Sequence, residues 1–346
     1  MRSPSTPMAP SSTSTHASPV RSSEKNRGRD AATALWKVVD IPGKGKGLIV
    51  TRDIKPGTLL LSEAPLITTD VVSHLDTAEQ DLSNALGKLS LGDQDSLRAL
   101  HNNFPENPDQ LCGILQSNGY PMGAECGGLF PAIARINHSC LPNSVQHWNE
   151  LLGKLTIHAV RPIAAGEEVT TTYKVPGASA ARKKLLKENF RFDCVCELCS
   201  LPADELRASD ERITRQEELR EIIGDSKTVY YKPDEVIRCA RSLFDLYEQD
   251  GIKDGRLSSL FYDLFQICNM HSDLARARCF AKYYSDAAKI AEGEDSINVL
   301  DIKPYIKNPQ KHDSFFSTKK WETKTSDVPK GLKPGAFATW LWRESI

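Results

Sequence analysis

The densest group of metal-binding residue types is a run of three cysteines, Cys194, Cys196 and Cys199. This Cys-x-Cys-x-x-Cys spacing supplies three thiolates within one short loop. Structural zinc is bound by four ligands in a tetrahedron, often all sulfur, so a fourth ligand has to come from another part of the chain. The first 30 residues contain no apolar export signal, and metal binding therefore explains the cluster better than disulfide bonds do. Three free buried cysteines are the alternative.

A second group of reactive residue types lies in the segment 135–143, RINHSCLPN. Polar side chains flanked by apolar residues are costly to bury unless they are paired. The segment is therefore either a turn whose polar groups satisfy one another or part of a binding site, and the residue types alone do not decide between the two.

Two further segments carry weaker signals. In the segment 43–48, GKGKGL, repeated glycines before a strand let the backbone approach a ligand closely. The pattern lacks the helix that follows in a dinucleotide-binding fingerprint or a phosphate loop, and a flexible turn is the alternative. The segment 166–173, GEEVTTTY, is a turn that leads into a strand ending in a tyrosine, and most such tyrosines only pack in a core or at an edge.

Short strands and helices have to position these groups. Apolar or alternating runs bounded by Gly and Pro predict strands at 48–50, 59–61, 144–148, 155–160 and 169–173. Helical spacing predicts an insert between these strands, with a capping box at Thr77 and Gln80 and a further helix at 108–118.

The second half of the chain has a helical pattern. Helices are predicted at 179–190, from Pro233 onward and after a cap at Ser272, whereas 301–346 fits no single pattern. The apolar stripes of these helices are typical of a buried core. The predicted fold class is therefore α+β, mainly short strands in small sheets, with a helical insert and an all-α C-terminal region.

Composition excludes several classes of protein. The 346 residues include 44 Lys and Arg and 45 Asp and Glu, and the resulting net charge of −1 argues against a protein devoted to nucleic-acid binding, which usually carries a basic excess. A local basic groove is the alternative, and direct sequence-specific binding of nucleic acid is not expected. No apolar run approaches the roughly 18 residues of a membrane-spanning helix. The first 30 or so residues are rich in Ser, Thr and Pro and cannot bury enough surface to fold, which predicts a disordered tail. A nuclear-import signal in this tail is the alternative.

The four segments together resemble the SET-domain protein lysine methyltransferases. The motif NHSCxPN at 137–143 matches the most specific motif of that family. The segments 45–48 and 166–173 resemble its two other motifs, and the three cysteines resemble its post-SET zinc loop. The long insert and the C-terminal helices are most similar to the SET-and-MYND branch and its fungal-type relatives. The insert holds too few Cys and His residues for a MYND zinc finger.

The resemblance implies how the chain is organised. It divides the chain into a tail at 1–33, a SET domain at 34–178 with a helical insert at about 70–125, a post-SET zinc loop at 179–200 and a helical region at 201–346. The cysteines outside the two motifs are expected to be core thiols: Cys112, Cys126, Cys239, Cys268 and Cys279.

In this family a methyl group passes from S-adenosylmethionine to a lysine ε-amine. The resemblance makes Tyr173 the catalytic residue, which would position the amine and the methyl group. It assigns donor binding to Lys44, Gly45, Lys46, Asn118, Asn137, His138, Tyr173 and Phe192, with Asn118 matched more loosely and the Phe192 ring stacked on the adenine. It also implies a structural zinc ion with Cys140 as the fourth ligand, beside Cys194, Cys196 and Cys199.

An active enzyme is the leading interpretation. The alternatives are a catalytically inactive SET module that acts as a peptide-binding scaffold, and a zinc-organised interaction protein whose C-terminal helices carry the function. The implied partner is a protein substrate with a histone or non-histone lysine. We expect a monomer located in the nucleus, the cytoplasm or both, without contact to membranes.

Overall fold

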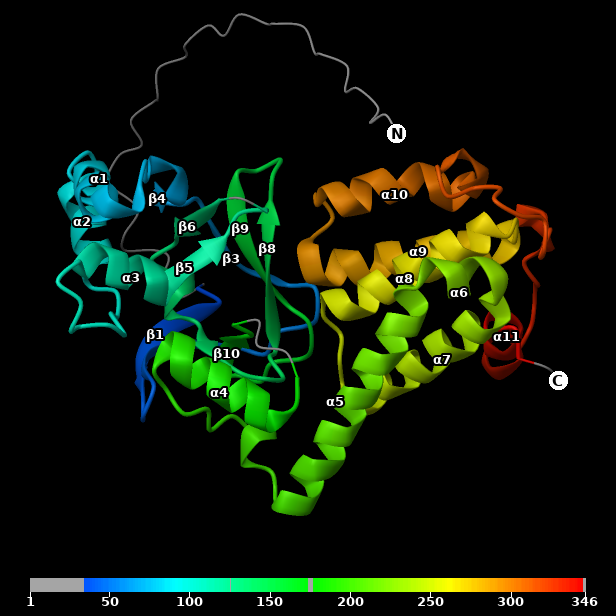
Figure 1. Cartoon of the computed structure of the whole chain (residues 1–346), viewed down its shortest axis with the longest axis horizontal. Helices are drawn as coiled ribbons and strands as arrows, with labels where there is room; N and C mark the ends of the chain where they lie inside the picture. The colour runs from blue at the N-terminus through cyan, green and yellow to red at the C-terminus, as the bar shows by residue number, and fades with distance from the viewer. Residues whose placement is uncertain (1–33, 125, 174–176, 345–346) are drawn as a thin grey trace, which may run out of the picture. The chain divides into compact units, whose positions relative to one another are not determined.

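Short strands and helices divide the chain into two regions (Figure 1). The computed structural model describes residues 34–124, 126–173 and 177–344, and the predicted tail at 1–33 lies outside the described residues. Small sheets in the first region and helices in the second confirm the predicted fold class. The described residues form three sheets. The first has the strand order β1 (Trp36–Ile41), β2 (Gly45–Val50), β10 (Glu168–Thr171), β7 (Asn137–His138). The second has the order β3 (Leu59–Glu63), β9 (Lys154–Ala159), β8 (Ser144–Asn149), and the third the order β4 (Ile67–Thr68), β6 (Gly127–Leu129), β5 (Gly119–Pro121).

The first of these sheets brings three of the sequence motifs together. β1 and β2 form a hairpin whose turn contains Gly43 and Gly45, both with φ of +74°, where the absence of a Cβ avoids strain. β10 pairs antiparallel with β2 and parallel with β7, so that Thr171 lies opposite His138. Leu48 of β2 is fully buried beneath this sheet in the core of the first region.

The insert between the strands contains α1 (Ala78–Leu86), α2 (Leu91–Arg98) and α3 (Gln110–Asn118). Leu82 of α1 and Ile114 of α3 belong to their shared core. The predicted capping box is wrong. Thr77 precedes α1, but its φ of −107° and ψ of 2° are not those of an N-cap, and its hydroxyl donates to the Asp81 carboxylate at 2.9 Å.

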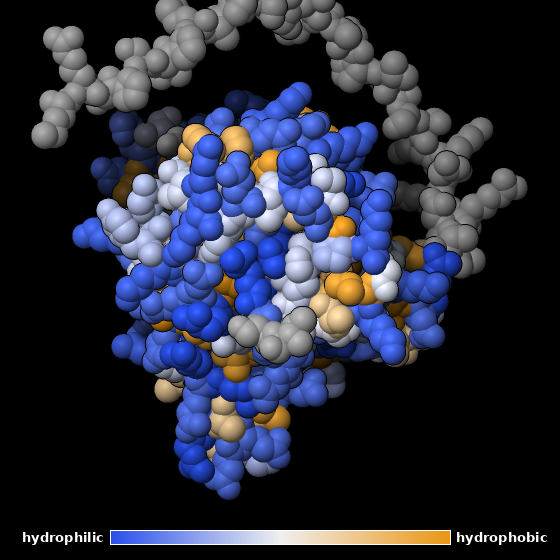
Figure 2. Space-filling view, turned by 90° about the vertical axis from the view of Figure 1, so that its right-hand side faces the viewer, coloured by the Kyte–Doolittle hydropathy of each residue, from blue (hydrophilic) through white to orange (hydrophobic). Residues whose placement is uncertain are grey.

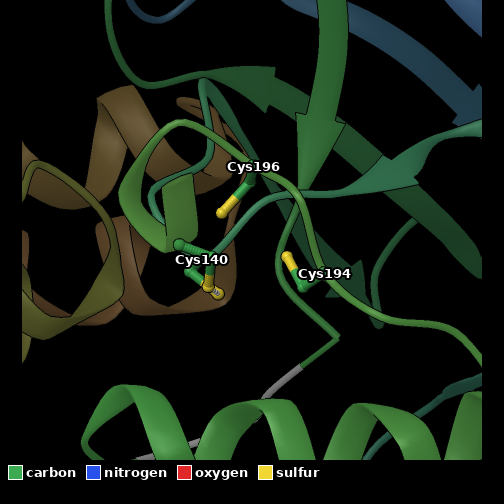
Figure 3. Close-up of side chains that lie close together, drawn as sticks. Cys140, Cys194 and Cys196 are labelled. Carbon is green, nitrogen blue, oxygen red and sulfur yellow. Dashed lines mark hydrogen bonds between the residues drawn. The ribbon is translucent and has the colours of Figure 1, made fainter. Parts of the chain in front are cut away.

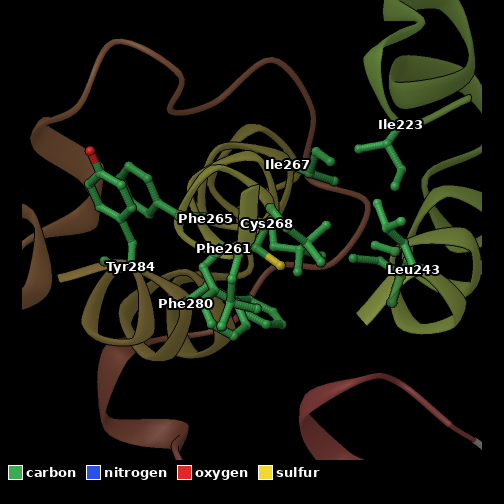
Figure 4. Packing of buried hydrophobic residues seen from close by; sticks show 14 of the residues in the cluster. Ile223, Leu243, Phe261, Phe265, Ile267, Cys268, Phe280 and Tyr284 are labelled. Atoms are coloured by element: carbon green, nitrogen blue, oxygen red, sulfur yellow. The ribbon is translucent and has the colours of Figure 1, made fainter. Parts of the chain in front are cut away.

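The helices of the second region enclose a larger core (Figure 4). They are α5 (Ala203–Gly224), α6 (Ser226–Tyr231), α7 (Pro233–Gln249), α8 (Gly255–Met270), α9 (Leu274–Glu292), α10 (Ile297–Lys307) and α11 (Pro334–Leu341). α4 (Ser179–Phe190) precedes them and packs with the cysteines of the loop that follows it. Leu243, Phe265 and Phe280 join α7, α8 and α9 in this core. The face of the molecule shown in Figure 2 is mostly hydrophilic, with apolar side chains in small separate groups. No helix among the described residues is both long and apolar enough to cross a membrane.

The two regions pack against each other near the NHSC motif. Leu141, which directly follows Cys140, packs against the core of the helical region. His147 of β8 lies next to the end of α9, with its Nε2 atom 3.8 Å from a carboxylate oxygen of Glu292. The motif is therefore anchored in both the sheets and the helices.

The N-terminus of α9 is capped by Asp273 and not, as predicted, by Ser272. The Asp273 carboxylate accepts hydrogen bonds from the backbone N–H of Arg276 at 3.2 Å and from the guanidinium groups of Arg276 and Arg343 at 2.8 and 3.0 Å. Ser272 has φ of +65°, and its hydroxyl donates to the Thr318 carbonyl. Asp273 is fully buried, so the same carboxylate caps the helix and neutralises two arginines.

Because Asp273 has this double role, we expect Asp273→Ala to destabilise the fold unusually strongly. The change should lower the free energy of unfolding by about 3–5 kcal/mol, because it leaves Arg276 and Arg343 without their shared anion. Asp225→Ala is the matched control, since Asp225 caps α6 through the Thr228 N–H at 2.7 Å on the surface, and it should cost clearly less. Urea denaturation of the two variants measures the difference. Equal losses would show that the buried ion pairs add nothing to the cap.

Candidate active site and metal centre

A cavity of about 930 Å³ lies where the sequence motifs meet. Its walls come from the turn between β1 and β2, the end of α3, β7, the end of β10 and the loop after α4. All residues predicted to bind the donor line it: Lys44, Gly45, Lys46, Asn118, Asn137, His138, Tyr173 and Phe192. The volume is near the upper end of the roughly 300–1,000 Å³ that small-molecule sites occupy. Residues separated by up to 148 positions are thus brought into one pocket.

Glu168, the first residue of β10, holds the glycine turn and the NHSC motif together. One carboxylate oxygen lies 2.7 Å from the Lys44 Nζ atom, and the other accepts from the Asn137 amide at 2.8 Å. The same amide donates to the Lys46 carbonyl at 3.2 Å, so both of its N–H groups are used within the protein. Sequence reasoning assigned no role to Glu168. The sequence signal that could have indicated this role is the position of Glu168 in the GEE motif, together with the lysines of the GKGKGL segment.

His138 connects the end of β10 to the cysteines. Its Nδ1 atom accepts from the backbone N–H of Tyr173 at 3.1 Å, and its Nε2 atom lies 3.3 Å from the Cys140 sulfur. Burial lowers the pKa of His138 to about 4, so the ring is neutral at pH 7. With Nδ1 as the acceptor, the single ring proton is on Nε2 and is donated to Cys140.

Tyr173 is enclosed by aromatic rings. Its ring centroid lies 4.8 Å from that of Phe190, 5.1 Å from that of His138 and 6.3 Å from that of Phe192. Its hydroxyl donates to the Ile136 carbonyl at 3.1 Å. Burial raises the pKa of Tyr173 above its usual value, so the phenol keeps its proton. What the hydroxyl offers to a ligand is therefore the lone pairs of its oxygen.

Asn118 closes another side of the cavity. Its amide nitrogen donates to the carbonyls of His101 and Ile114 at 2.7 and 2.8 Å, which fixes the orientation of the side chain. The amide oxygen is then the atom that Asn118 presents to a ligand, and it can accept a hydrogen bond. The looser sequence match at Asn118 thus corresponds to a residue in the wall of the same cavity.

Four cysteines gather beside this cavity: Cys140, Cys194, Cys196 and Cys199. Their sulfur atoms all lie within 4.8 Å of one another, and those of Cys140 and Cys199 are 3.5 Å apart. Figure 3 shows the two loops from which they converge. Four sulfurs around a zinc ion at about 2.3 Å are about 3.8 Å apart, so these residues fit a tetrahedral site. They are the single group of this kind among the residues that the structure describes.

The thiols of this cluster share their protons unequally. Hydrogen bonds with Cys194 and the other two thiols raise the pKa of Cys140, whereas hydrogen bonds from Cys140 and its neighbours lower that of Cys196. Hydrogen bonds from Cys140 and Cys194 lower the pKa of Cys199 to about 7. A hydrogen bond with Cys140 lowers the pKa of Cys194, but hydrogen bonds with Cys196 and Cys199 outweigh it and raise that pKa. Thiolates are therefore favoured at Cys196 and Cys199, and binding a metal through all four sulfurs requires the other two thiols to lose their protons as well.

The remaining cysteines do not form a uniform class. Cys268 is buried, as predicted for a core thiol. Cys239 and Cys279 are half-buried and pack against the core of the helical region, and Cys112 is half-buried and packs against the core of the insert, which agrees with the prediction. Cys126 is half-buried in the segment before β6, and the Thr69 hydroxyl lies 3.7 Å from its sulfur.

Comparison with known proteins indicates the same family as the motifs do. Residues 45–174 match the SET domain family. The chain is 33% identical over 282 residues to histone-lysine N-methyltransferase set5 of Schizosaccharomyces pombe, an alignment that covers 81% of this chain and 86% of set5.

Two further relatives are matched over a smaller share of their length. The chain is 26% identical over 268 residues to human N-lysine methyltransferase SMYD2, in an alignment that covers 71% of this chain and 58% of SMYD2. It is 30% identical over 151 residues to histone-lysine N-methyltransferase ASHR1 of Arabidopsis thaliana, in an alignment that covers 39% of this chain and 30% of ASHR1. The match to set5 spans most of both chains and is the decisive one. With its SET motifs on paired strands around one cavity, the chain belongs to the SET-domain family of lysine methyltransferases.

Proposed function

We propose that this chain is an active protein-lysine methyltransferase whose reaction takes place in the 930 Å³ cavity, with Tyr173 at the reacting centre. The observation that carries the proposal is that one cavity gathers every residue matched to the family's donor-binding and catalytic motifs. A protein that had lost the activity would not need this complete set. Binding of S-adenosylmethionine by calorimetry and transfer of its labelled methyl group to protein lysines test the proposal together.

The reaction requires a neutral lysine amine. When bound, S-adenosylmethionine supplies a methyl group activated by its sulfonium. A free lysine has a pKa of about 10.4, so presenting the neutral amine at pH 7 costs about 4–5 kcal/mol. The rings of Phe190 and Phe192 and the neutral imidazole of His138 surround Tyr173 with groups that solvate an ammonium poorly. Such surroundings lower the pKa of an amine that enters them.

Tyr173 is suited to orient that amine and not to deprotonate it. Its proton is donated to the Ile136 carbonyl, and burial raises its pKa, so it is not a base at neutral pH. The lone pairs of its oxygen can accept an N–H of the amine and fix the direction of the nitrogen lone pair. Alignment of this kind lowers a barrier by several kcal/mol without any proton transfer to the protein.

The turn between β1 and β2 is the proposed site for the amino-acid end of the donor. Lys44 brings a positive charge to this turn, and Glu168 holds that charge in place. Asn137 is held by Glu168 and the Lys46 carbonyl, so its amide oxygen is the atom left to face a donor N–H. Phe192 is proposed to stack on the adenine ring.

The four-cysteine cluster is proposed to hold one structural zinc ion. Four sulfur ligands complete a tetrahedron and leave no position for a reactive water, so such a zinc takes no part in methyl transfer. Its role is to order the loop that carries Phe192 against the strand that carries His138, whose ring centroids are 6.1 Å apart.

The substrate class is proposed from the relatives. The name of set5 states that it acts on histone lysine, and that of SMYD2 states only a lysine substrate. We therefore propose protein lysines as substrates, with histones as the first candidates, and a nuclear location where histones are modified. Incubation of the chain and labelled donor with histones and with a proteome extract identifies the labelled lysines.

Tyr173→Phe tests the catalytic assignment. It should lower turnover on a verified substrate by about 100-fold, because it removes the oxygen that orients the amine, and should leave donor affinity unchanged. Tyr120→Phe is the matched control, since Tyr120 also lines the cavity and its hydroxyl also meets a backbone carbonyl, that of Ile133 at 3.4 Å. Steady-state methylation measures both. Wild-type turnover in Tyr173→Phe, or an equal loss in the control, would contradict the assignment.

Gly47→Ala tests the donor site. A Cβ at Gly47 would lie 2.5 Å from Ile41 Cγ1, 2.9 Å from the Asn137 amide and 3.0 Å from a Glu168 oxygen, so it would push the last two apart. Donor affinity should fall by roughly 10-fold or more, as expected for one lost hydrogen bond to a charged group. Gly92→Ala is the control, because a Cβ there meets no atom within 4 Å. Calorimetry showing unchanged affinity for Gly47→Ala would count against this turn as the donor site.

Removal of the metal tests the zinc site. The wild type should contain one zinc per chain by mass spectrometry. A strong chelator or Cys199→Ser should remove the zinc and weaken donor binding while the strands stay folded, because the Phe192 loop loses its anchor. Cys239→Ser, a thiol outside the cluster, should keep the metal. Tight donor binding by a folded, zinc-free chain would refute the coupling.

A further inference from the structure

Arg182, in the second turn of α4, is a buried cation whose hydrogen bonds are incomplete. Only 3% of the residue is exposed. Its Nη1 atom donates to the Gly177 carbonyl at 2.6 Å and lies 3.9 Å from an Asp210 oxygen. Its Nε and Nη2 atoms are buried and have no hydrogen-bond partner among the described residues. Unsatisfied buried donors on a charged group are costly, so these two N–H groups call for an acceptor.

The position of Arg182 on α4 indicates what that acceptor is. Leu186 lies one turn further along α4 and packs in one cluster with the thiols of Cys194, Cys196 and Cys199. Residues four apart on a helix share a face, so Arg182 belongs to the face that covers the cysteines. The guanidinium also lies close enough to Cys140 and Cys199 to interact with both thiols electrostatically.

A zinc ion bound by four thiolates has a net charge of −2. In a buried site this charge needs nearby donors or cations, since water does not screen it. His138 supplies one donor to Cys140 through Nε2. The guanidinium of Arg182 is buried and permanently charged, and its two unpartnered N–H groups match what thiolate sulfurs accept.

We propose that Arg182 is a positioning residue of the four-cysteine centre, whose two free N–H groups donate to the thiolate sulfurs and whose charge offsets part of the −2. Arg182 also connects the centre to the C-terminal helices. The Asp210 carboxylate of α5 accepts hydrogen bonds from the backbone N–H and the hydroxyl of Ser179 at the start of α4, at 2.7 and 2.5 Å. The same carboxylate lies 3.9 Å from the Arg182 Nη1 atom. The inference rests on the zinc site proposed above.

The test compares zinc retention in the full chain. Arg182→Met removes the charge and the donors while keeping most of the volume, and Arg182→Lys keeps the charge but replaces the planar set of guanidinium donors with a single ammonium group. Lys184→Met is the matched control, because Lys184 is on the same helix with a side chain that is 74% exposed. Excess chromogenic chelator should take zinc from Arg182→Met about 10–100-fold faster than from the wild type, from Arg182→Lys at an intermediate rate, and from Lys184→Met at the wild-type rate.

A second variant separates this role from a merely structural one. Asp210→Asn weakens the tie between α5 and Arg182 but leaves the arginine beside the cysteines. It should lower the melting temperature without faster zinc release. In cobalt-substituted protein, the thiolate-to-metal absorption band should shift in Arg182→Lys and stay in place in Asp210→Asn. Equal acceleration of metal loss in Asp210→Asn and Arg182→Met would overturn the inference.

The outcomes distinguish the inference from the zinc site itself. A wild-type chain without zinc would refute the zinc site and the inference together. A zinc-containing wild type with wild-type release rates in both Arg182 variants would refute the inference alone. If Arg182→Met does not fold, Arg182→Lys decides, since release at the wild-type rate from that variant is also contrary to the proposal.

Discussion

The pairing of β10 with two different strands is the constraint on which the rest of the site depends. β10 bonds to β2 on one side and to β7 on the other, so the strand after the glycine turn, the NHSC motif and the segment that leads to Tyr173 are held by one set of backbone hydrogen bonds. Glu168 at the start of β10 reaches both neighbours through Lys44 and Asn137. Just beyond its end, the Tyr173 N–H donates to His138. A register shift of one residue would turn these side chains to the other face of the sheet and separate them.

The cysteine cluster connects the segment after β7 to the loop after α4, which is not part of a sheet. His138 donates to Cys140, and the other three cysteines follow α4 in a loop that lines the cavity with Phe192. A bound metal would convert several weak S–H contacts into four strong bonds and so order the loop. The pocket therefore has two kinds of wall: strands that are paired in a sheet, and a loop that lies beside the four cysteines.

The helical region supports the same elements from outside. Leu141 anchors the NHSC motif in the helical core, and Asp210 of α5 holds the first residue of α4. Leu141 directly follows Cys140, and α4 leads into the loop that carries the other three cysteines, so both contacts lie close in the chain to the four-cysteine cluster. The helices thus serve the site by holding the segments that support it.

The sequence by itself determined the family, the motifs and the elements with local signals. Helix α4 lies at the predicted 179–190, and the four proposed zinc ligands were found from spacing and resemblance. Such features depend on the periodicity of neighbouring residues, which a sequence displays directly. Only the tertiary structure decided the role of Glu168, the cap at Asp273 and the position of Arg182. The Asp273 cap itself is local, through the Arg276 N–H, but its pairing with Arg343 involves a residue 70 positions away, and Glu168 and Arg182 likewise depend on distant segments. Whether a polar group is buried and paired is decided by the packing of distant segments, which local pattern does not contain.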